Sequence, residues 1–305
     1  RGVRCFPEQV IIQAGTQVSI QNLVQLFDPA VDAVAMEEPG YDKIRVVFEQ
    51  ARFKVIACPT YEGVPLFMRS LAASAAKLCF VTPSNQFPTG AILPMQARLR
   101  LLEWAHATDA YVLEDDYCRE FRYNAHPVPS LKSLDTNHRV IYMGTFSKTL
   151  SPALRVSYLI LPPELLKCWN NHFSMINSAV PWLSQVVLRR FIEQGHYEKL
   201  IRRALTRNKQ KYETLIAALN KHLGNRVELT DNGAGLHILV KVRDGRSQQE
   251  LVHLAEEAGV GVYETSPYWM SASPAQENHI LIGFSSIRKE DIEPGIQALA
   301  KAWFG

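Results

Sequence analysis

The sequence has no apolar run long enough to cross a membrane. A helix that spans a bilayer needs roughly 18 or more consecutive apolar residues, and every apolar run in this chain falls short of that length. It also has no signal peptide, which would show as a charged start followed by an apolar stretch. We therefore expect a cytoplasmic protein that makes no contact with a membrane.

Cysteine and excess charge are also scarce. The five cysteines are odd in number and show neither a CxxC spacing nor a cluster of metal ligands, so we expect reduced thiols and no metal site. The net charge of +3 is too small to indicate nucleic-acid binding by itself. A hydrophobic share of 47% with 21% charged residues is typical of an ordinary globular chain.

Apolar runs and amphipathic stretches alternate through the first two thirds of the 305 residues. Strands separated by helices, and apolar on nearly every residue, predict an α/β fold with a mainly parallel sheet covered on both faces. The predicted strands are 10–13, 53–57, 77–82, 110–114, 139–143 and 156–161, and the predicted helices are 17–27 and one through Ala97 and Ala105.

The pattern changes near Trp182, where a long helical region runs to about Leu223 with a break near Gly195. Its arginines and lysines are interspersed with glutamates, which favours a solvated helix face over a nucleic-acid stripe. Strands at 236–240, 261–263 and 280–284 and helices at 248–258 and 289–303 predict a smaller α+β domain. We expect a large domain over 1–200 and a small C-terminal domain over 201–305.

Lys148 is the most informative residue. It follows the strand-like run 139–143, stands among hydroxyl side chains, and precedes Arg155 by seven positions. An amine at the end of a strand beside an anion site suits a Schiff base with an aldehyde cofactor that carries a phosphate. Thr145, Ser147 and Arg155 offer donors for one phosphate, and an arginine can bind it with two parallel hydrogen bonds.

Two further segments suit the same site. Gly15 and Thr16 lie where a strand turns into a helix, and free backbone N–H groups at a helix start bind phosphate, although Gly-Thr also makes an ordinary helix cap. The run Glu114 to Tyr117 follows a strand at the edge where open α/β sheets bind ligands. A carboxylate there could keep a pyridine nitrogen protonated; the alternatives are an acidic turn and a divalent metal site, and the missing third ligand disfavours metal.

The segment around Lys148 also invites comparison with the nucleotide-binding loop GxxxxGK[ST]. Ser147 stands where the loop needs the glycine before its lysine, and Tyr142 stands where it needs the first glycine. A nucleotide triphosphatase is therefore disfavoured.

Taken together, these segments resemble the fold type I pyridoxal-phosphate enzymes of the aspartate aminotransferase-like class. They resemble more closely the aminotransferase-like domain of MocR-type transcriptional regulators of the GntR superfamily. The resemblance covers essentially the whole chain in order and spacing, and its signature stretches are 13–17, 38–41, 81–90, 113–123, 142–155 and 259–263.

The resemblance implies pyridoxal 5′-phosphate as the cofactor and gives each site residue a role. Lys148 would form the internal aldimine, Asp115 would pair with the pyridine nitrogen, and Tyr117 with the ring hydroxyl. Tyr41 would stack on the ring, although a tyrosine after Pro-Gly is often only a packed turn residue. The phosphate would be held by Gly15, Thr16, Thr145 and Arg155, with Ser147 as a further contributor.

Two departures from the aminotransferase pattern bear on catalysis. Aminotransferases usually carry an asparagine where this chain has Phe87, and an arginine that grips the substrate carboxylate where it has Leu281. Losing that arginine would weaken binding of an amino-acid carboxylate by roughly 2–4 kcal/mol. These changes make full transamination doubtful.

We therefore expect the effector-sensing domain of a transcriptional regulator, which binds pyridoxal phosphate as a Schiff base and responds to an amine, an amino acid or pyridoxal phosphate itself. The resemblance implies a homodimer. It also implies an N-terminal winged helix-turn-helix DNA-binding domain outside this chain, which fits a first residue other than Met. The alternatives are an active aminotransferase acting on an amino acid and a scaffold without a cofactor.

Overall fold

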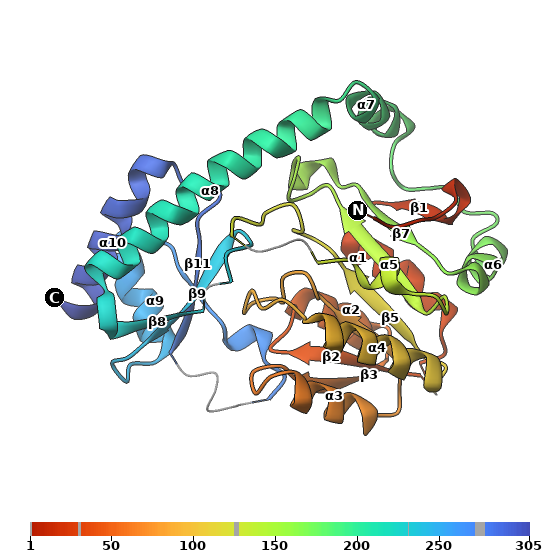
Figure 1. Ribbon diagram of the computed structural model, residues 1–305, viewed down its shortest axis with the longest axis horizontal. Helices are drawn as coiled ribbons and strands as arrows, with labels where there is room; N and C mark the ends of the chain where they lie inside the picture. The colour runs from red at the N-terminus through yellow and green to blue at the C-terminus, as the bar shows by residue number, and fades with distance from the viewer. Residues whose placement is uncertain (1, 30–31, 125–127, 231, 272–277) are drawn as a thin grey trace. The chain divides into compact units, whose positions relative to one another are not determined.

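The computed structural model describes residues 2–29, 32–124, 128–230, 232–271 and 278–305. Its chain divides into two compact units (Figure 1). The first comprises residues 1–86, 91–119 and 127–198, and the second comprises residues 87–90, 120–126 and 199–305. Two short stretches from the first half of the sequence thus belong to the second unit.

The first unit is built on one large sheet. Within the described residues its strand order is β1-β7-β6-β5-β4-β2-β3. The strands β3, β2, β4, β5 and β6 run parallel, and β7 is antiparallel to its neighbours β6 and β1. The predicted α/β class with a mainly parallel sheet is confirmed. The strands are β1 (Val10–Gln13), β2 (Ala33–Glu38), β3 (Lys54–Pro59), β4 (Ala76–Val81), β5 (Tyr111–Asp115), β6 (Val140–Thr145) and β7 (Ser157–Ile160).

Six of these strands match predicted ones within a few residues, but β2 was not predicted. Its sequence ends in Glu37 and Glu38, and both are buried, at 5% and 3% exposure. Sequence patterns treat a pair of carboxylates as solvent-facing, because burying a charge is costly unless it is compensated. Glu37 is compensated, because its carboxyl accepts hydrogen bonds from the backbone N–H (3.0 Å) and hydroxyl (2.7 Å) of Thr82.

Helices connect the strands. They are α1 (Thr16–Leu23), α2 (Asp42–Gln50), α3 (Val64–Ala72), α4 (Met95–Ala107), α5 (Leu131–Leu134), α6 (Pro163–His172) and α7 (Trp182–Glu193), followed by α8 (His196–His222). The predicted break near Gly195 is confirmed: Gly195 has a φ of +71° between α7 and α8, as is common just after a helix end.

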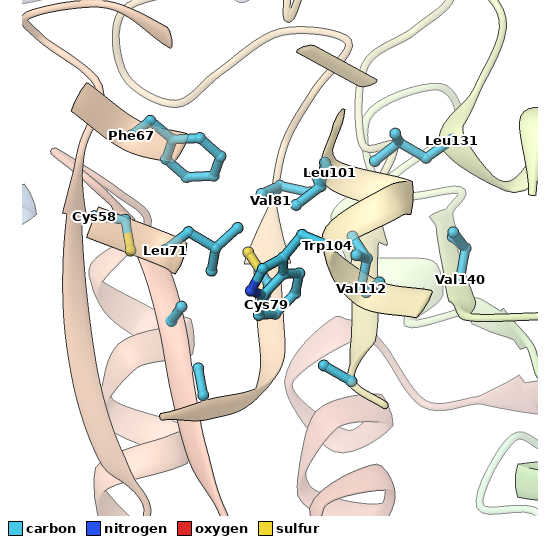
Figure 2. Packing of buried hydrophobic residues seen from close by; sticks show 14 residues of the cluster. Cys58, Phe67, Leu71, Cys79, Val81, Leu101, Trp104, Val112, Leu131 and Val140 are labelled. Atoms are coloured by element: carbon cyan, nitrogen blue, oxygen red, sulfur yellow. The ribbon is translucent and has the colours of Figure 1, made fainter. Parts of the chain in front are cut away.

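A hydrophobic cluster joins α3 and α4 to one face of the sheet. Phe67 and Leu71 of α3 and Leu101 and Trp104 of α4 pack against alternate residues of the strands, among them Cys79 of β4 (Figure 2). Side chains alternate between the two faces along a strand, so the neighbouring residues lie on the opposite face, where α1 contacts β6 and β7 and α2 contacts α1. Asp115 and Thr145 fall on that opposite face by their register with Val112 and Val140.

The second unit has an antiparallel sheet of order β10-β11-β9-β8 in its described residues. The strands are β8 (Val227–Thr230), β9 (His237–Val242), β10 (Tyr263–Glu264) and β11 (His279–Gly283), with helices α9 (Gln248–Glu257) and α10 (Lys289–Phe304). The four-residue β8 was not predicted. None of the helices in the described ranges combines the length and apolar character that a membrane crossing needs.

Candidate functional site

The predicted site residues gather at one edge of the large sheet. Asp115 and Thr145 are the last residues of the adjacent parallel strands β5 and β6, and Gly15 caps the N-terminus of α1 after β1. The carboxyl ends of parallel strands form the ligand-binding edge of an open α/β sheet. All nine predicted residues belong to the first unit.

Gly15 and Arg155 lie against one another. Gly15 adopts φ 96° and ψ 161°, a region of backbone space open essentially to glycine alone. A Cβ atom at this position would overlap the guanidinium of Arg155. The chain therefore requires glycine here both for its backbone angles and for the approach of an arginine side chain.

The start of α1 is fixed to the sheet by serines. Ser19 Oγ donates to the carbonyl of Gly15 at 3.1 Å and lies 2.9 Å from Ser157 Oγ of β7. The first N–H groups of a helix have no partner within it, and here they begin at Thr16, directly beside the Arg155 guanidinium. Backbone N–H groups, the Thr16 hydroxyl and a guanidinium in one place form a site for an anion.

Lys148 lies in a turn directly after β6. The turn is fixed at both ends: Phe146 N–H donates to Val156 O at 3.1 Å, and Leu150 N–H donates to Phe146 O at 2.8 Å. Thr145 Oγ1 donates to Ser147 Oγ at 3.0 Å and accepts from the Ser147 N–H at 3.1 Å. Lys148 is exposed in the turn, so its amine is accessible to a small molecule.

Asp115 is a buried acidic residue of the site. Its side chain is buried at 4% exposure, and Oδ1 has no hydrogen-bond partner among the described residues. The pKa of Asp115 is raised to about 8. Burial is the largest cause and the nearby Asp116 adds to it, whereas the nearby Lys148 ammonium acts in the opposite direction. A buried carboxyl oxygen without a donor has an unmet need that a ligand N–H would satisfy.

Tyr117 follows Asp115 by two residues and has a partner that the sequence did not predict. Asn85, in the turn after β4, donates from Nδ2 to the Tyr117 hydroxyl oxygen at 2.7 Å. Burial raises the pKa of Tyr117 well above its ordinary value, so its hydroxyl keeps its proton. The sequence signal for Asn85 is its place in the stretch 81–90, two residues before Phe87.

Tyr41 is half-buried and caps the start of α2, immediately after Pro39 and Gly40. The carbonyl of Tyr41 accepts from the N–H groups of Ile44 and Arg45 at 3.2 and 3.3 Å. Its backbone therefore has a role in the helix start. Ring stacking by Tyr41 stays a prediction.

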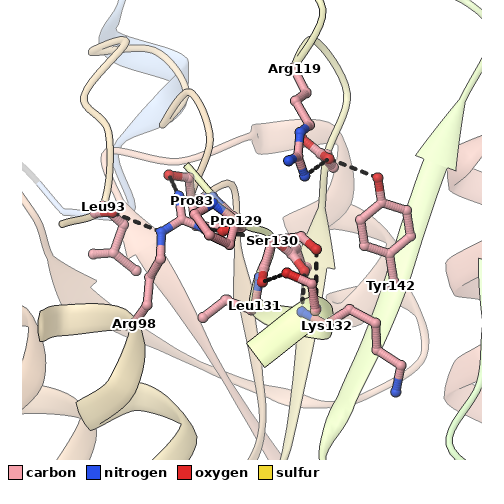
Figure 3. A network of polar contacts seen from close by, with 12 residues as sticks. Pro83, Leu93, Arg98, Arg119, Pro129, Ser130, Leu131, Lys132 and Tyr142 are labelled. Carbon is pink, nitrogen blue, oxygen red and sulfur yellow. Dashed lines mark hydrogen bonds and ion pairs between the residues drawn. The ribbon is translucent and has the colours of Figure 1, made fainter. Parts of the chain in front are cut away.

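A buried polar network supports the loops around the site. Arg98 of α4 is fully buried and donates to the carbonyls of Leu93, Pro83 and Pro129 at 2.9, 2.6 and 3.0 Å (Figure 3). Glu114 accepts from the N–H groups of Leu131 and Lys132 at 2.8 and 2.9 Å, and burial raises its pKa to about 7. Arg98 thereby ties the turn that carries Asn85 to the segment before α5.

Asp116 is the last acidic residue of the run 114–116. The Tyr142 hydroxyl donates to Asp116 Oδ2 at 2.7 Å, and Arg119 lies 3.6 Å from the same oxygen (Figure 3). Glu114 therefore accepts hydrogen bonds at both oxygens and Asp116 at Oδ2, whereas Oδ1 of Asp115 has no partner among the described residues. Among the residues the structure describes, no group of three or more histidine, cysteine, aspartate or glutamate side chains could hold a metal ion.

These residues fit pyridoxal phosphate. Asp115 Oδ1, which has no partner among the described residues, suits a protonated ring nitrogen, and the Tyr117 hydroxyl suits a ring oxyanion. At Gly15, the missing Cβ atom lets the Arg155 guanidinium approach the start of α1, where the cofactor phosphate would bind. Lys148 is close enough to Asp115 to influence its pKa.

Comparisons with known proteins agree with the fold and extend along the chain. The family model for aminotransferase class I and II matches residues 2–299. The uncharacterized HTH-type transcriptional regulator YhdI of Bacillus subtilis is 41% identical over 99% of this chain and 64% of its own length. The probable rhizopine catabolism regulatory protein MocR of Rhizobium meliloti is 33% identical over 99% of this chain and 61% of its own length.

A solved structure is similar over nearly the same region. LysN, the α-aminoadipate aminotransferase of Thermus thermophilus, was crystallised with N-(5′-phosphopyridoxyl)-L-leucine and superposes with a TM-score of 0.85. It is 26% identical, and the match covers 97% of this chain and 77% of that one. The chain thus spans less than two thirds of the two regulators and about three quarters of the enzyme.

Proposed function

Because the chain belongs to the aminotransferase class I and II family, we propose that it binds pyridoxal 5′-phosphate covalently through Lys148 and senses a small molecule for a transcriptional regulator. The observation that carries the proposal is the buried Oδ1 of Asp115, which has no partner in the described residues and lies in the electrostatic range of Lys148. A carboxylate left unsatisfied beside an amine fits a ligand that brings both a ring N–H and a carbonyl carbon.

When bound, the cofactor would supply an aldehyde that condenses with primary amines and a ring that withdraws electrons. The chain's own residues would bind and orient it. Asp115 would hold a proton on the ring nitrogen, and Tyr117 would donate to the ring oxygen. The Lys148 amine would form the Schiff base, and the helix start at Thr16 with Arg155 would bind the phosphate, assisted by Thr145 and Ser147.

A sensor is favoured over an enzyme for two reasons. The regulator YhdI matches 99% of the chain at 41% identity, well above the 26% of the aminotransferase LysN. The chain also carries Leu281 where the aminotransferase pattern has a carboxylate-binding arginine, and this leucine is buried in β11 at 7% exposure. An apolar side chain cannot pair with an amino-acid carboxylate.

The regulator as a whole would bind DNA through a winged helix-turn-helix domain outside this chain. YhdI is an HTH-type transcriptional regulator and MocR is a probable regulatory protein, and the similarity to both supports a role in transcriptional control. The effector would be an amine, an amino acid or pyridoxal phosphate itself.

A homodimer is the proposed assembly. Several large apolar side chains in and just before α7 are exposed, which soluble monomers generally avoid in groups. They are Met175 (92%), Ile176 (65%), Trp182 (75%), Leu183 (67%) and Val187 (58%). A second copy of the chain would cover them.

The visible absorption spectrum of the protein mixed with pyridoxal phosphate tests the proposal. We expect a new band for the wild type and none for Lys148→Ala. Adding an amino acid and a keto-acid acceptor separates the two functions: a sensor changes its spectrum without sustained product formation. Continuous turnover would establish the alternative, an active aminotransferase acting on an amino acid, which the similarity to LysN supports.

A further inference from the structure

Asn85 lies in a position to control the hydrogen bonding of Tyr117. Its side chain is buried at 3% exposure, and its Nδ2 lies 2.7 Å from the Tyr117 hydroxyl oxygen. An amide N–H can only donate, so the phenol oxygen accepts this bond and its own proton is directed elsewhere. The Cys118 thiol also lies within hydrogen-bonding range of that hydroxyl, but a thiol is a weak hydrogen-bond partner.

The turn that carries Asn85 is held rigidly. The Asn85 N–H donates to Thr82 O at 3.2 Å, and Thr82 in turn donates twice to the buried carboxyl of Glu37. On the far side, Leu93 N–H donates to Pro83 O at 2.9 Å, and Arg98 donates to the same carbonyl at 2.6 Å. These bonds fix the amide before any ligand arrives, which is the requirement for a positioning group.

The side-chain oxygen of Asn85 is the second polar atom of its amide. Its Oδ1 is buried and has no hydrogen-bond partner among the described residues, as is also true of Asp115 Oδ1. A buried amide oxygen without a donor destabilises a protein. A donor group on a bound ligand would satisfy this oxygen.

We infer that Asn85 is a positioning residue for the cofactor: it holds the Tyr117 phenol so that its hydroxyl donates to the ring oxyanion of pyridoxal phosphate. This inference rests on the proposed function. It also accounts for Phe87, because the amide that the aminotransferase pattern has at that position is supplied here from two residues earlier in the same loop.

The expected effect appears in the pH titration of the bound cofactor. The ring oxyanion shares the proton of the Schiff-base nitrogen, so a donor to the oxyanion lowers the pH at which that proton leaves. In Asn85→Ala the phenol is no longer oriented toward the ring oxyanion. The midpoint of the absorption change should therefore rise by about half to one pH unit. Binding of pyridoxal phosphate should weaken about tenfold, as expected for the loss of one hydrogen bond. Asn85→Asp should raise the midpoint further, because a carboxylate would accept the phenol proton and add negative charge.

A double-mutant cycle with Tyr117→Phe decides whether Asn85 acts through the phenol. In the Tyr117→Phe background, Asn85→Ala should shift the midpoint little further, since the group it positions is gone. Gln86→Ala is the matched control: it removes a side chain of the same turn whose amide donates to Pro39 O at 2.6 Å. It should leave the midpoint unchanged.

The outcomes separate this inference from the proposed function. A wild-type protein without an absorption band for bound cofactor would refute both. A wild-type band with an unchanged midpoint in Asn85→Ala and Asn85→Asp, or fully additive shifts in the cycle, would refute the role of Asn85 alone. If Asn85→Ala fails to fold, the nearly isosteric Asn85→Asp carries the same test.

Discussion

Gly15 and Arg155 touch at the edge of the sheet that carries the candidate site, with no room for a Cβ atom between the glycine and the guanidinium. The two residues are far apart in the sequence, and pairing of β1 with β7 brings them together. Arg155 has a left-handed backbone with φ 50° and ψ 43°, which is uncommon outside glycine and asparagine. The contact therefore joins two unusual backbone positions at one cradle, and it is the part of the site most sensitive to small changes.

Replacing Gly15 by alanine should disrupt phosphate binding. The new Cβ would displace the Arg155 guanidinium, and the backbone region is strained for any residue but glycine. We expect binding of pyridoxal phosphate to weaken at least tenfold, on the order of 1.4 kcal/mol or more, while binding of phosphate-free pyridoxal changes little. Equilibrium dialysis with both compounds measures this difference.

Gly195→Ala is the control for the glycine change. Gly195 also has a positive φ, of +71°, but a Cβ there would meet nothing within 4 Å. It should destabilise the fold by about 1–2 kcal/mol and leave the preference for the phosphorylated compound intact. Equal effects of the two substitutions on that preference would contradict an anion site at Gly15.

Lys148 should be the point of covalent attachment. After reduction with borohydride, the wild type mixed with pyridoxal phosphate should gain the mass of one cofactor on the peptide that contains Lys148. Lys148→Ala should gain none, whereas Lys167→Ala, which removes an exposed lysine of α6, should behave like the wild type. Labelling at another lysine in the wild type would refute the assignment.

Asp115 should make the cofactor-free protein less stable as the pH rises. Burial raises its pKa to about 8, with Asp116 adding to the rise, whereas the same carboxyl in an unfolded chain titrates near 3.9. Folding thus favours the protonated form, and its contribution is fully present below about pH 4 and lost as the pH rises through 8. The loss is on the order of a few kcal/mol, since one pKa unit corresponds to about 1.4 kcal/mol.

Urea unfolding of the cofactor-free protein at several pH values tests this prediction. Asp115→Asn should flatten the decline between pH 4 and 8, and part of the slope should persist because burial also raises the pKa of Glu37 and Glu114 to about 7. The exposed Glu103 of α4 provides the control substitution Glu103→Gln. A slope in Asp115→Asn equal to that of the wild type would show that Asp115 is ionised in the folded state.

The exposed apolar residues of α7 should control association. Trp182→Glu with Leu183→Glu should shift the protein toward a monomer in sedimentation experiments, because charges would then face the apolar contact. The control is Leu99→Glu on α4, which changes a residue with 46% exposure and should leave the assembly as it is. A wild type that sediments as a monomer would refute the homodimer.

The periodic pattern of the sequence was sufficient for most of the large sheet. Strands such as β5 and β6 are nearly continuous apolar runs, which is the pattern expected of strands that are buried on both faces of a parallel sheet. It failed for β2, because Glu37 and Glu38 are buried, and the Glu37 carboxyl is compensated by hydrogen bonds from Thr82, just after β4, which no local pattern contains. The sequence did not predict β8, because its four residues are too few to show a periodic pattern.

For the site, the sequence alone determined which chemical groups exist and where along the chain they lie: the amine of Lys148, the acidic run ending in Tyr117, and the glycine before α1. Tertiary structure alone decided which of them are free to act. Glu114 accepts hydrogen bonds at both oxygens, whereas Asp115 Oδ1 has no partner among the described residues, and Asn85 reaches Tyr117 only because β4 and β5 are adjacent. Composition and spacing cannot reveal these differences, since they depend on which donors the folded chain brings within about 3 Å of each oxygen.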